Sequence, residues 1–432
     1  MNDILRPYQQ ELVERALPIL ETHNIVYLAF EMRVGKSLTS MALAERVNAK
    51  SVLFVTEKSA ISSIEGDCTA LAPNYTITIT NYERLRKIGH NYDLIIIDEA
   101  HGLGKFPKPS LRAQQLRRIA SNDCKVIYLS GTPTPESFSQ IFHQLWITPH
   151  SPFPHKTFYK WAAEYVTITQ KRISGGTLIN DYSNADQAAI ELQTKHLFVT
   201  KSQKDAGFEN YEVFEEVQYI KPDPRIHDLA RAMTRHSYYK FSDGTELVAE
   251  TAVSLQSKLH QIYSGTVITG DEPKILDTSK AKYIYNTFTT GQYDKIAVFY
   301  KYQAERAALE RTIPRDLCHT TPEAFNSAQR GFYMAQIAAG SQGVNLASAD
   351  VLLFYNISFS SMHYWQSRAR IQSLERPTPA KVIWLFTEGG IEEKIYKAVL
   401  DKRNYTLRHF TTDYHLTHKP LTNTHVQNHY GK

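Results

Sequence analysis

The sequence predicts an α/β fold in which two lobes each contain a doubly wound parallel sheet, with a nucleotide cleft between the lobes. Three observations support this fold class. The chain of 432 residues is longer than one hydrophobic core usually organises. Short apolar runs alternate with helical patterns in both halves of the chain, as they do in parallel βαβ units. Polar and glycine-containing motifs follow directly after apolar runs, where open parallel sheets bind their ligands.

The composition is that of a globular protein, with 42% apolar and 22% charged residues. No apolar run reaches membrane-spanning length and the first residues show no signal-peptide pattern, so we expect a cytoplasmic location and no membrane partner. Cys68, Cys124 and Cys318 are far apart and lack CxxC spacing, which argues against a zinc site or a disulfide framework. The net charge of +5 permits an anionic polymer as partner.

The first lobe is predicted to span residues 1–150, where strands and helices alternate. We expect strands at 26–30, 51–56, 76–79, 93–97 and 125–130, and helices near 38–47, 110–120 and 136–146. The proline-rich segment 150–155 breaks this pattern and indicates a boundary.

Residues 151–212 are predicted to form an insertion and linker, and residues 213–408 the second lobe. A β-hairpin at 166–179 has a basic, glycine-containing tip, which we interpret as a solvated turn rather than a strand-splitting wedge. We expect helices near 185–195, 224–240, 247–262, 302–312, 362–372 and 391–405, and strands at 295–299, 351–354 and 381–386. The tail 409–432 has five histidines without metal-ligand spacing and is predicted to be poorly ordered.

Two adjacent carboxylates, Asp98 and Glu99, end the apolar strand predicted at 93–97. A buried parallel strand places such a polar end at the carboxyl edge of its sheet. One acid there can hold Mg²⁺, and the other can orient or deprotonate an attacking water. A strand end that runs into a capped helix is the alternative for this segment taken alone.

A phosphate-binding loop is predicted between the strand at 26–30 and the helix at 38–47. Backbone N–H groups at the helix start would face phosphates, Lys36 would add positive charge, and the Ser37 hydroxyl would contact Mg²⁺. The strict loop pattern has glycine where this chain has Phe30, and Arg33 lies inside the loop. The loop residues predicted to contact nucleotide are Met32, Arg33, Val34, Gly35, Lys36 and Ser37.

An ordered series of motifs links these sites to the rest of the chain. It runs through residues 5–9, 31–37, 79–83, 98–101, 130–133, 340–346 and 366–370, with a softer match at 391–396. The series resembles superfamily 2 nucleic-acid motors, specifically the Snf2-like branch that includes many compact phage DNA helicases of the branch-migration class. The resemblance covers most of the chain and implies two RecA-like lobes, with ATP and Mg²⁺ as cofactors.

In the first lobe, the resemblance implies that Gln9, with Arg6 nearby, reads the adenine base. It implies that Asp98 holds Mg²⁺ through its shell and that Glu99 activates water. Residues Ser130, Gly131 and Thr132 match the motif that couples hydrolysis to the nucleic-acid track.

In the second lobe, Gly343 and Asn345 match a motif that faces ATP and nucleic acid, and Gln366 precedes the arginine motif. Arg370 matches the arginine that stabilises charge on the γ-phosphate. The family's next arginine would fall at Ser373, so Arg368 and Arg376 stay open as alternatives for this role.

The predicted function is an ATP-dependent DNA helicase or translocase that unwinds or remodels forked or branched DNA in replication, recombination or repair, in the host cytoplasm if a phage encodes it. Ser130-Gly131-Thr132 followed by proline is more typical of DNA-directed relatives, which makes RNA the less expected partner. Open alternatives are a duplex DNA translocase without strand separation, an RNA helicase, and a nucleotide-gated DNA-binding module whose ATPase is inactive.

Overall fold

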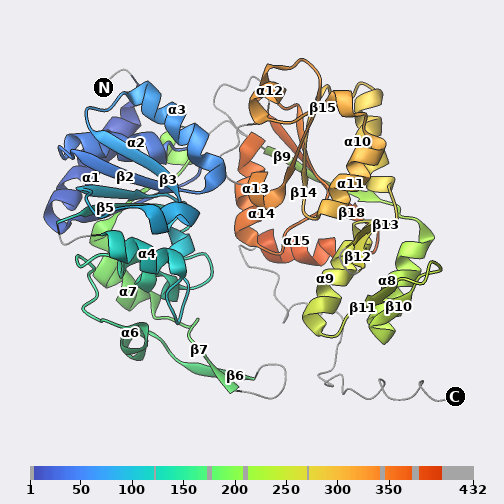
Figure 1. Cartoon of the computed structure of the whole chain (residues 1–432), viewed down its shortest axis with the longest axis horizontal. Coiled ribbons are helices and arrows are strands. Elements are labelled where there is room, and N and C mark those ends of the chain that lie inside the picture. Colours follow the sequence, from blue (N-terminus) through green and yellow to red (C-terminus); the bar gives the residue numbers. More distant parts are fainter. Residues whose placement is uncertain are drawn as a thin grey trace. The chain divides into compact units, whose positions relative to one another are not determined.

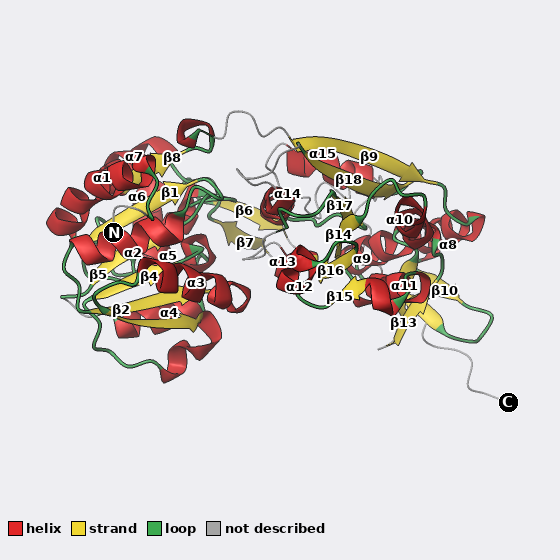
Figure 2. Cartoon of the chain, turned by 90° about the horizontal axis from the view of Figure 1, so that it is seen from above, coloured by secondary structure: helices red, strands yellow, loops and turns green. Residues whose placement is uncertain are grey.

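The computed structural model describes residues 4–120, 123–172, 178–207, 213–269, 272–340, 346–371 and 379–400. The chain divides into two compact units, Met1–Asn210 and Tyr211–Lys432. In its described part, each unit contains a six-stranded parallel sheet with helices on both faces (Figures 1 and 2). The predicted α/β fold with two parallel sheets is therefore confirmed.

The sheet of unit 1 has the strand order β3-β2-β4-β5-β1-β8, and all its neighbours are parallel. The strands are β1 (Ile25–Phe30), β2 (Ser51–Thr56), β3 (Thr76–Asn81), β4 (Leu94–Ile97), β5 (Lys125–Leu129) and β8 (Phe198–Lys201). Successive strand residues alternate between two buried apolar clusters: Tyr27 and Ile95 belong to one, and Leu28 and Ile96 to the other. Helices therefore cover both faces, which explains why these strands appear in the sequence as continuous apolar runs.

Strand β8 is a difference from the predicted domain organisation. The segment 151–212 was expected to be an insertion and linker, but its residues Phe198–Lys201 pair with β1 in the sheet of unit 1. A four-residue strand with two polar residues gives little periodic signal, so its place depends on a partner about 170 residues earlier in the chain.

The helices of unit 1 include three that the sequence reading did not place, α1, α3 and α6. The helices are α1 (Pro7–His23), α2 (Lys36–Arg46), α3 (Ile61–Leu71), α4 (Leu111–Ile119), α5 (Ile141–Leu145), α6 (Phe158–Tyr165) and α7 (Gln187–Thr194). Between α6 and α7, β6 (Thr169–Arg172) and β7 (Leu178–Asp181) form the predicted antiparallel hairpin. Residues 173–177 of its predicted tip lie outside the described residues.

The sheet of unit 2 has the strand order β15-β16-β14-β17-β18-β9, again with parallel neighbours. The strands are β9 (Val213–Ile220), β14 (Lys295–Tyr300), β15 (Cys318–His319), β16 (Gly331–Gln336), β17 (Val351–Phe354) and β18 (Ala380–Thr387). Strands β14, β17 and β18 match the prediction. Strands β9, β15 and β16 were missed, and β9 pairs with β18 over eight residues.

The helices of unit 2 are α8 (Pro224–His236), α9 (Ala252–Tyr263), α10 (Ser279–Thr289), α11 (Gln303–Thr312), α12 (Pro322–Ser327), α13 (Ile337–Gly340), α14 (Ser361–Arg368) and α15 (Glu392–Leu400). Five of them, α8, α9, α11, α14 and α15, overlap the predicted runs, whereas α10, α12 and α13 were not predicted. Two small antiparallel pairs join β10 (Tyr238–Lys240) to β11 (Glu246–Val248) and β12 (Thr266–Thr269) to β13 (Glu272–Ile275). The predicted tail 409–432 lies outside the described residues. Among the helices that the structure describes, none combines the length and apolar character needed to cross a bilayer.

Candidate functional site

The predicted phosphate loop lies between β1 and α2. Gly35 is the N-cap of α2 and has a left-handed backbone with φ of 81°. A Cβ atom at this position would lie 2.2 Å from Nε2 of Gln9, so both the backbone and the space require glycine. Arg33 has a φ of 63°, which bends the loop a second time. The loop therefore turns the start of α2 towards the carboxyl edge of the sheet.

Lys36 extends back over this loop. Its ammonium group donates to the carbonyl oxygens of Phe30 at 3.0 Å and Glu31 at 3.2 Å. The Cβ position of Gly131, which follows β5, lies 3.8 Å from Lys36 Nζ. Lys36 and the predicted coupling motif thus meet where β1 and β5 end, as the strand–loop–helix pattern predicts.

The start of α1 braces the loop from the other side. Gln9 is 3% exposed; its Oε1 accepts from the Arg6 backbone N–H at 2.9 Å, and its Nε2 donates to the Gly35 carbonyl at 3.3 Å. The Tyr8 hydroxyl donates to the Val34 carbonyl at 3.3 Å. The structure therefore places Gln9 beside the phosphate loop, while the Arg6 side chain is exposed.

A further brace comes from residues that the sequence reading missed. Gln203, just after β8, donates from Nε2 to the Met32 carbonyl at 2.9 Å, and its backbone N–H donates to the Glu31 carboxylate at 2.8 Å. No motif marks Gln203, because its contact depends on β8 lying beside β1. The register of those two strands is the signal that could have identified it.

Asp98 is fixed at the end of β4. Its carboxylate accepts from the Thr56 hydroxyl at 2.8 Å and from the Glu99 backbone N–H at 3.0 Å, and its carbonyl accepts from the Tyr82 hydroxyl. Burial and the neighbouring Glu99 carboxylate raise the pKa of Asp98 to about 6, partly opposed by Thr56 and Lys36. Thr56 comes from the adjacent strand β2 and was not predicted, whereas Tyr82, from the segment after β3, lies within the motif at 79–83 but was given no role there.

Glu99 connects the acid pair to the predicted coupling motif. Its carboxylate lies 3.3 Å from Nδ1 of His101, and the same nitrogen lies 3.0 Å from the Ser130 hydroxyl oxygen. Ser130 in turn accepts from the Thr132 backbone N–H at 3.1 Å. Burial lowers the pKa of His101 to about 4, so its imidazole is neutral at pH 7. A continuous contact therefore runs from Glu99 through His101 to Ser130.

This arrangement fits a magnesium ion held mainly through water. The described residues contain no cluster of three or more His, Cys, Asp or Glu side chains, so an all-protein metal cage is excluded among them. Mg²⁺ commonly uses one or two carboxylates and keeps several waters. Burial, and then the adjacent Glu99 carboxylate, raise the pKa of Asp98 and so disfavour its ionised form, which a bound cation would favour; Ser37 lies in the first turn of α2.

In unit 2, the structure separates the candidate arginines. Arg368 pairs with Glu215 on β9, and their side chains are 24% and 12% exposed. The same carboxylate accepts from Tyr364, from Trp384 Nε1 at 3.0 Å and from Tyr396 at 2.8 Å. Arg368 is thus part of a packed structural network.

Arg370 lies in the 3-10 helix Ala369–Ile371, and its carbonyl accepts from the Leu346 N–H at 3.1 Å. Its side chain is half-buried, and Gln366 is buried. The predicted sites Gly343 and Asn345 and the alternative Arg376 lie outside the described residues. The γ-phosphate role of Arg370 therefore stays a prediction.

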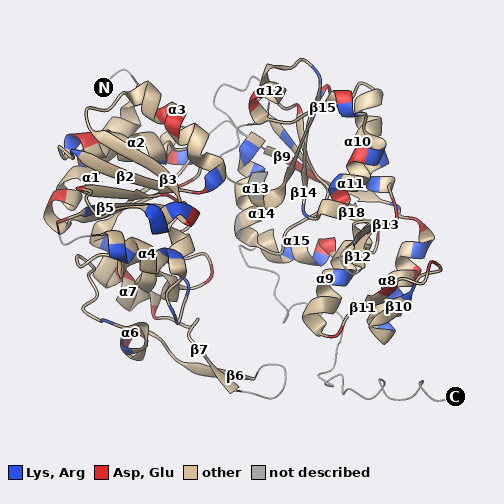
Figure 3. Ribbon diagram, viewed as in Figure 1, with Lys and Arg blue, Asp and Glu red and all other residues tan. Residues whose placement is uncertain are grey.

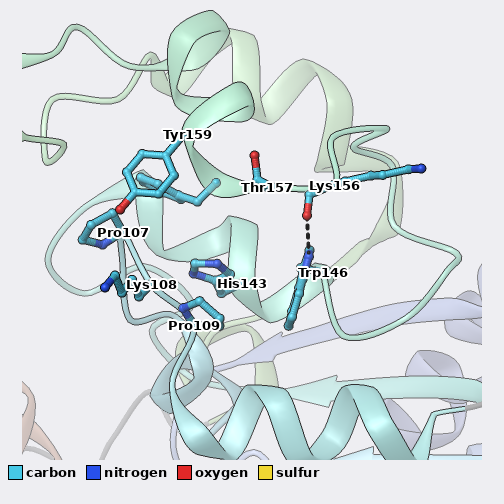
Figure 4. A pocket seen from close by; sticks show the side chains of 9 residues that line it. Pro107, Lys108, Pro109, His143, Trp146, Lys156, Thr157 and Tyr159 are labelled. Carbon is cyan, nitrogen blue, oxygen red and sulfur yellow. Dashed lines mark hydrogen bonds between the residues drawn. The ribbon is translucent and has the colours of Figure 1, made fainter.

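A pocket of about 200 Å³ lies elsewhere in unit 1 (Figure 4). It is lined mainly by proline and aromatic side chains, and Trp146 is held there by a hydrogen bond from Nε1 to the Lys156 carbonyl at 3.2 Å. None of the predicted site residues lines it; the lining residues are Pro107, Lys108, Pro109, His143, Trp146, Lys156, Thr157, Phe158 and Tyr159.

No protein-family model matches the chain. Three known proteins are similar to most of it at low identity. A SWI/SNF-related matrix-associated actin-dependent regulator of chromatin subfamily A-like protein 1 homolog of Caenorhabditis elegans is 23% identical, covering 92% of this chain and 61% of the relative. The subfamily A-like protein 1 of Xenopus laevis is 18% identical, covering 92% and 43%. The ISWI chromatin-remodeling complex ATPase ISW1 of Saccharomyces cerevisiae is 21% identical, covering 93% and 40%.

The chain therefore spans less than two thirds of the length of these relatives. Their names support the predicted similarity to the Snf2-like branch of superfamily 2, while the resemblance to phage helicases stays a prediction. The similarity extends over both units, which agrees with motifs found from residue 5 to residue 396.

Proposed function

We propose that the chain is an ATP-dependent DNA motor that hydrolyses ATP to translocate along DNA, and that it acts on forked or branched DNA. One observation carries the proposal. Lys36, Asp98 and Glu99 meet at the carboxyl edge of one sheet, and Glu99 is connected through His101 to Ser130. A site for phosphates, a metal-holding acid and a water-activating base is what nucleoside triphosphate hydrolysis requires.

The residues of unit 1 would divide the chemistry among them. Backbone N–H groups at the start of α2 and the Lys36 ammonium bind the phosphates, while Gln9 holds the loop in its bent shape. Mg²⁺, when bound, would neutralise phosphate charge and be held by the Ser37 hydroxyl and the Asp98 carboxylate. Glu99 orients the attacking water and accepts its proton.

The contact through His101 suggests how hydrolysis is transmitted. A proton that arrives on Glu99 removes the negative charge facing His101 Nδ1, and because the same nitrogen contacts Ser130, the His101–Ser130 contact would change with it. The Thr132 backbone N–H donates to the Ser130 hydroxyl, so the position of the coupling motif would respond to the protonation state of Glu99. Arg370 would stabilise charge on the γ-phosphate from unit 2, and Gly343 and Asn345 would face ATP and DNA.

Nucleic acid is the proposed partner because basic side chains gather near the site. Figure 3 shows Lys and Arg between β3 and α4. On the 3-10 helix Tyr82–Lys87, which directly follows β3, Arg84, Arg86 and Lys87 are exposed. Such side chains bind phosphates without reading sequence, which gives salt-sensitive affinity. The relatives' names point to chromatin, hence to DNA, and keep translocation along duplex without strand separation as the second candidate.

ATP turnover measured with single-stranded, duplex, forked and four-way-junction DNA, and with RNA of the same length, tests the proposal. We expect stimulation by DNA, strongest with forked or branched substrates, and loss of turnover in Lys36→Ala while the fold is retained. Equal turnover in Lys36→Ala and the parent would refute the site, and stimulation by RNA alone would refute the DNA assignment. Stimulation by duplex as strong as by forks would favour the second candidate.

A further inference from the structure

The hairpin between α6 and α7 exposes apolar side chains along its stem. In Figures 1 and 2 the strands β6 and β7 project from the body of unit 1. Ile168, Leu178 and Ile179 are 43%, 52% and 45% exposed. Among the described residues the two strands pair only with each other, and a lone two-stranded ribbon is marginally stable in water. Its apolar side chains therefore indicate that something covers the stem during function.

The apolar residues lie on both faces of the ribbon. Arg172 pairs with Leu178 and Lys171 with Ile179, so Leu178 and Ile179 point to opposite faces, and Ile168 shares the face of Leu178. A ribbon that packed on a protein surface would be apolar on one face and polar on the other. A ribbon that enters between two separating surfaces needs apolar contacts on both faces.

The root of the hairpin is firmly anchored. The Ser137 hydroxyl donates to the Ser183 carbonyl at 2.7 Å, and the Ser139 hydroxyl donates to the Tyr182 carbonyl at 2.5 Å. Across the root, the Asp186 N–H donates to the Tyr165 carbonyl at 2.7 Å. Both serines are buried, as is Tyr182. A force on the stem is thus carried into the body of unit 1 rather than absorbed by a loose hinge.

The anchor lies next to the coupling motif. Ser137 and Ser139 follow Ser130–Thr132 by a few residues. Gln144 connects this segment to the sheet: its side chain donates to the Pro133 carbonyl at 2.8 Å and accepts from the Tyr27 hydroxyl on β1 at 2.7 Å. A displacement of the coupling motif during ATP hydrolysis would therefore reach the hairpin root through short, buried contacts.

We propose that the stem of this hairpin is a wedge that separates the strands of duplex DNA at a fork, with Ile168, Leu178 and Ile179 against the terminal base pair. This inference rests on the proposed function. Apolar side chains of this type insert between base steps and unstack them, and a two-stranded ribbon matches the width of a DNA groove. The hairpin sequence contains two basic residues, Lys171 and Arg172, and one acidic residue, Asp181, and this excess of positive charge suits a polyanion.

A protein partner or a second copy of the chain fits the same features less well. A stable protein interface buries on the order of 1,200–2,000 Å² in a continuous patch. Here three apolar side chains are divided between opposite faces of a narrow ribbon, so neither face offers a patch of that size. A base step, in contrast, needs only one or two apolar side chains.

The test compares base pairs opened per ATP hydrolysed on a forked DNA duplex. One variant carries Ile168→Ser and Leu178→Ser, a second carries Ile179→Ser, and the control carries Leu192→Ser, which removes a 64% exposed leucine from α7. We expect each hairpin variant to lower the ratio about tenfold, which corresponds to the loss of one modest apolar contact with a base. The control should keep the parent ratio.

A ratio in both hairpin variants equal to that of the parent would overturn the wedge. So would a parent that hydrolyses ATP on forked DNA but opens no base pairs, although the proposed motor function would then survive as translocation. A parent whose ATP turnover no DNA stimulates would overturn both. Thermal unfolding of each variant separates the effect on the ratio from a folding defect, which we do not expect because all four side chains are exposed.

Discussion

Replacing Asp98 by Asn should stabilise the protein while abolishing its ATP turnover. Asp98 is deeply placed at the end of β4, and its pKa is raised from the ordinary 3.8 to about 6 by burial and by Glu99. At about 1.4 kcal/mol per pH unit, the ionised carboxylate destabilises the native state by about 3 kcal/mol at neutral pH. Because Glu99 shares this shift, we expect Asp98→Asn to add about 1–3 kcal/mol to the free energy of unfolding.

The sign of the pH dependence follows from proton binding. Between about pH 4 and 6 native Asp98 binds a proton that the unfolded chain lacks, so the parent loses stability as pH rises through this window. The destabilisation is complete above about pH 6 and absent below about pH 4. The advantage of Asp98→Asn should therefore be full at pH 7.5 and vanish on acidification. The asparagine Oδ1 can still accept from the Glu99 N–H, and its Nδ2 can donate to the Thr56 hydroxyl oxygen, so both contacts persist while the Thr56 O–H exchanges its role as donor for that of acceptor.

The assay is equilibrium unfolding in urea without nucleotide or Mg²⁺. At each urea concentration a short hydrogen-exchange pulse at fixed pH labels the unfolded fraction, and the label is read on peptides from β1 and β4, so that it reports on unit 1 alone. Asp93→Asn is the matched control, since the Asp93 carboxylate accepts backbone N–H groups of Lys50 and Ser51 at 2.8 and 3.0 Å. It should destabilise by about 1 kcal/mol. The reasoning would be refuted if the Asp98→Asn protein were less stable than the parent at pH 7.5. It would also be refuted if the stability gain of Asp98→Asn over the parent were as large at pH 4 as at pH 7.5.

Three further predictions concern the nucleotide site. Glu99→Gln should bind ATP but hydrolyse it at least about 100-fold more slowly; unchanged single-turnover rates would contradict this. Gly35→Ala should weaken ATP binding about tenfold or more, because its φ of 81° and the Gln9 amide both oppose a Cβ; Gly66→Ala, whose Cβ meets nothing within 4 Å, should bind normally. Arg370→Ala should lower kcat about 1,000-fold with ATP affinity nearly unchanged. Arg368→Ala should mainly lower the stability of unit 2, by about 2 kcal/mol, because it leaves the Glu215 carboxylate without its cation. A loss of kcat in Arg368→Ala and a loss of stability in Arg370→Ala would exchange their roles.

The sequence predicts the first sheet and the acid pair well because their signals are local. Strands β1 and β4 are continuous apolar runs, and each ends in polar residues whose chemistry is readable without the fold. Strands β8 and β9 were missed for the opposite reason. Strand β9 contains two adjacent glutamates, and it becomes a strand by pairing with β18 about 170 residues later in the chain.

The same contrast holds within the site. Lys36 was identified by its loop, but Gln203 and Thr56, which fix Met32 and Asp98, carry no motif because each acts through a neighbouring strand. Motif spacing left both Arg368 and Arg370 as candidates. The Glu215 contact, which no spacing reveals, shows that Arg368 takes part in a packed network.

The two acids of the site differ in ways that their adjacent positions conceal. Asp98 accepts from Thr56 and from a backbone N–H, so its carboxylate is held in one orientation, as a metal-holding group should be. Glu99, with a left-handed backbone of φ 50°, turns away from the strand direction and faces His101. Because burial lowers the pKa of His101 to about 4, the imidazole beside Glu99 is neutral at pH 7 and adds no positive charge there. A change of charge on Asp98 would act on the Thr56 hydroxyl and the Glu99 N–H, which hold its carboxylate in place. A change of charge on Glu99 would instead act on the His101 imidazole, which contacts Ser130. The difference between the two acids therefore arises from their neighbours, and under the proposed function the coupling step would pass through His101.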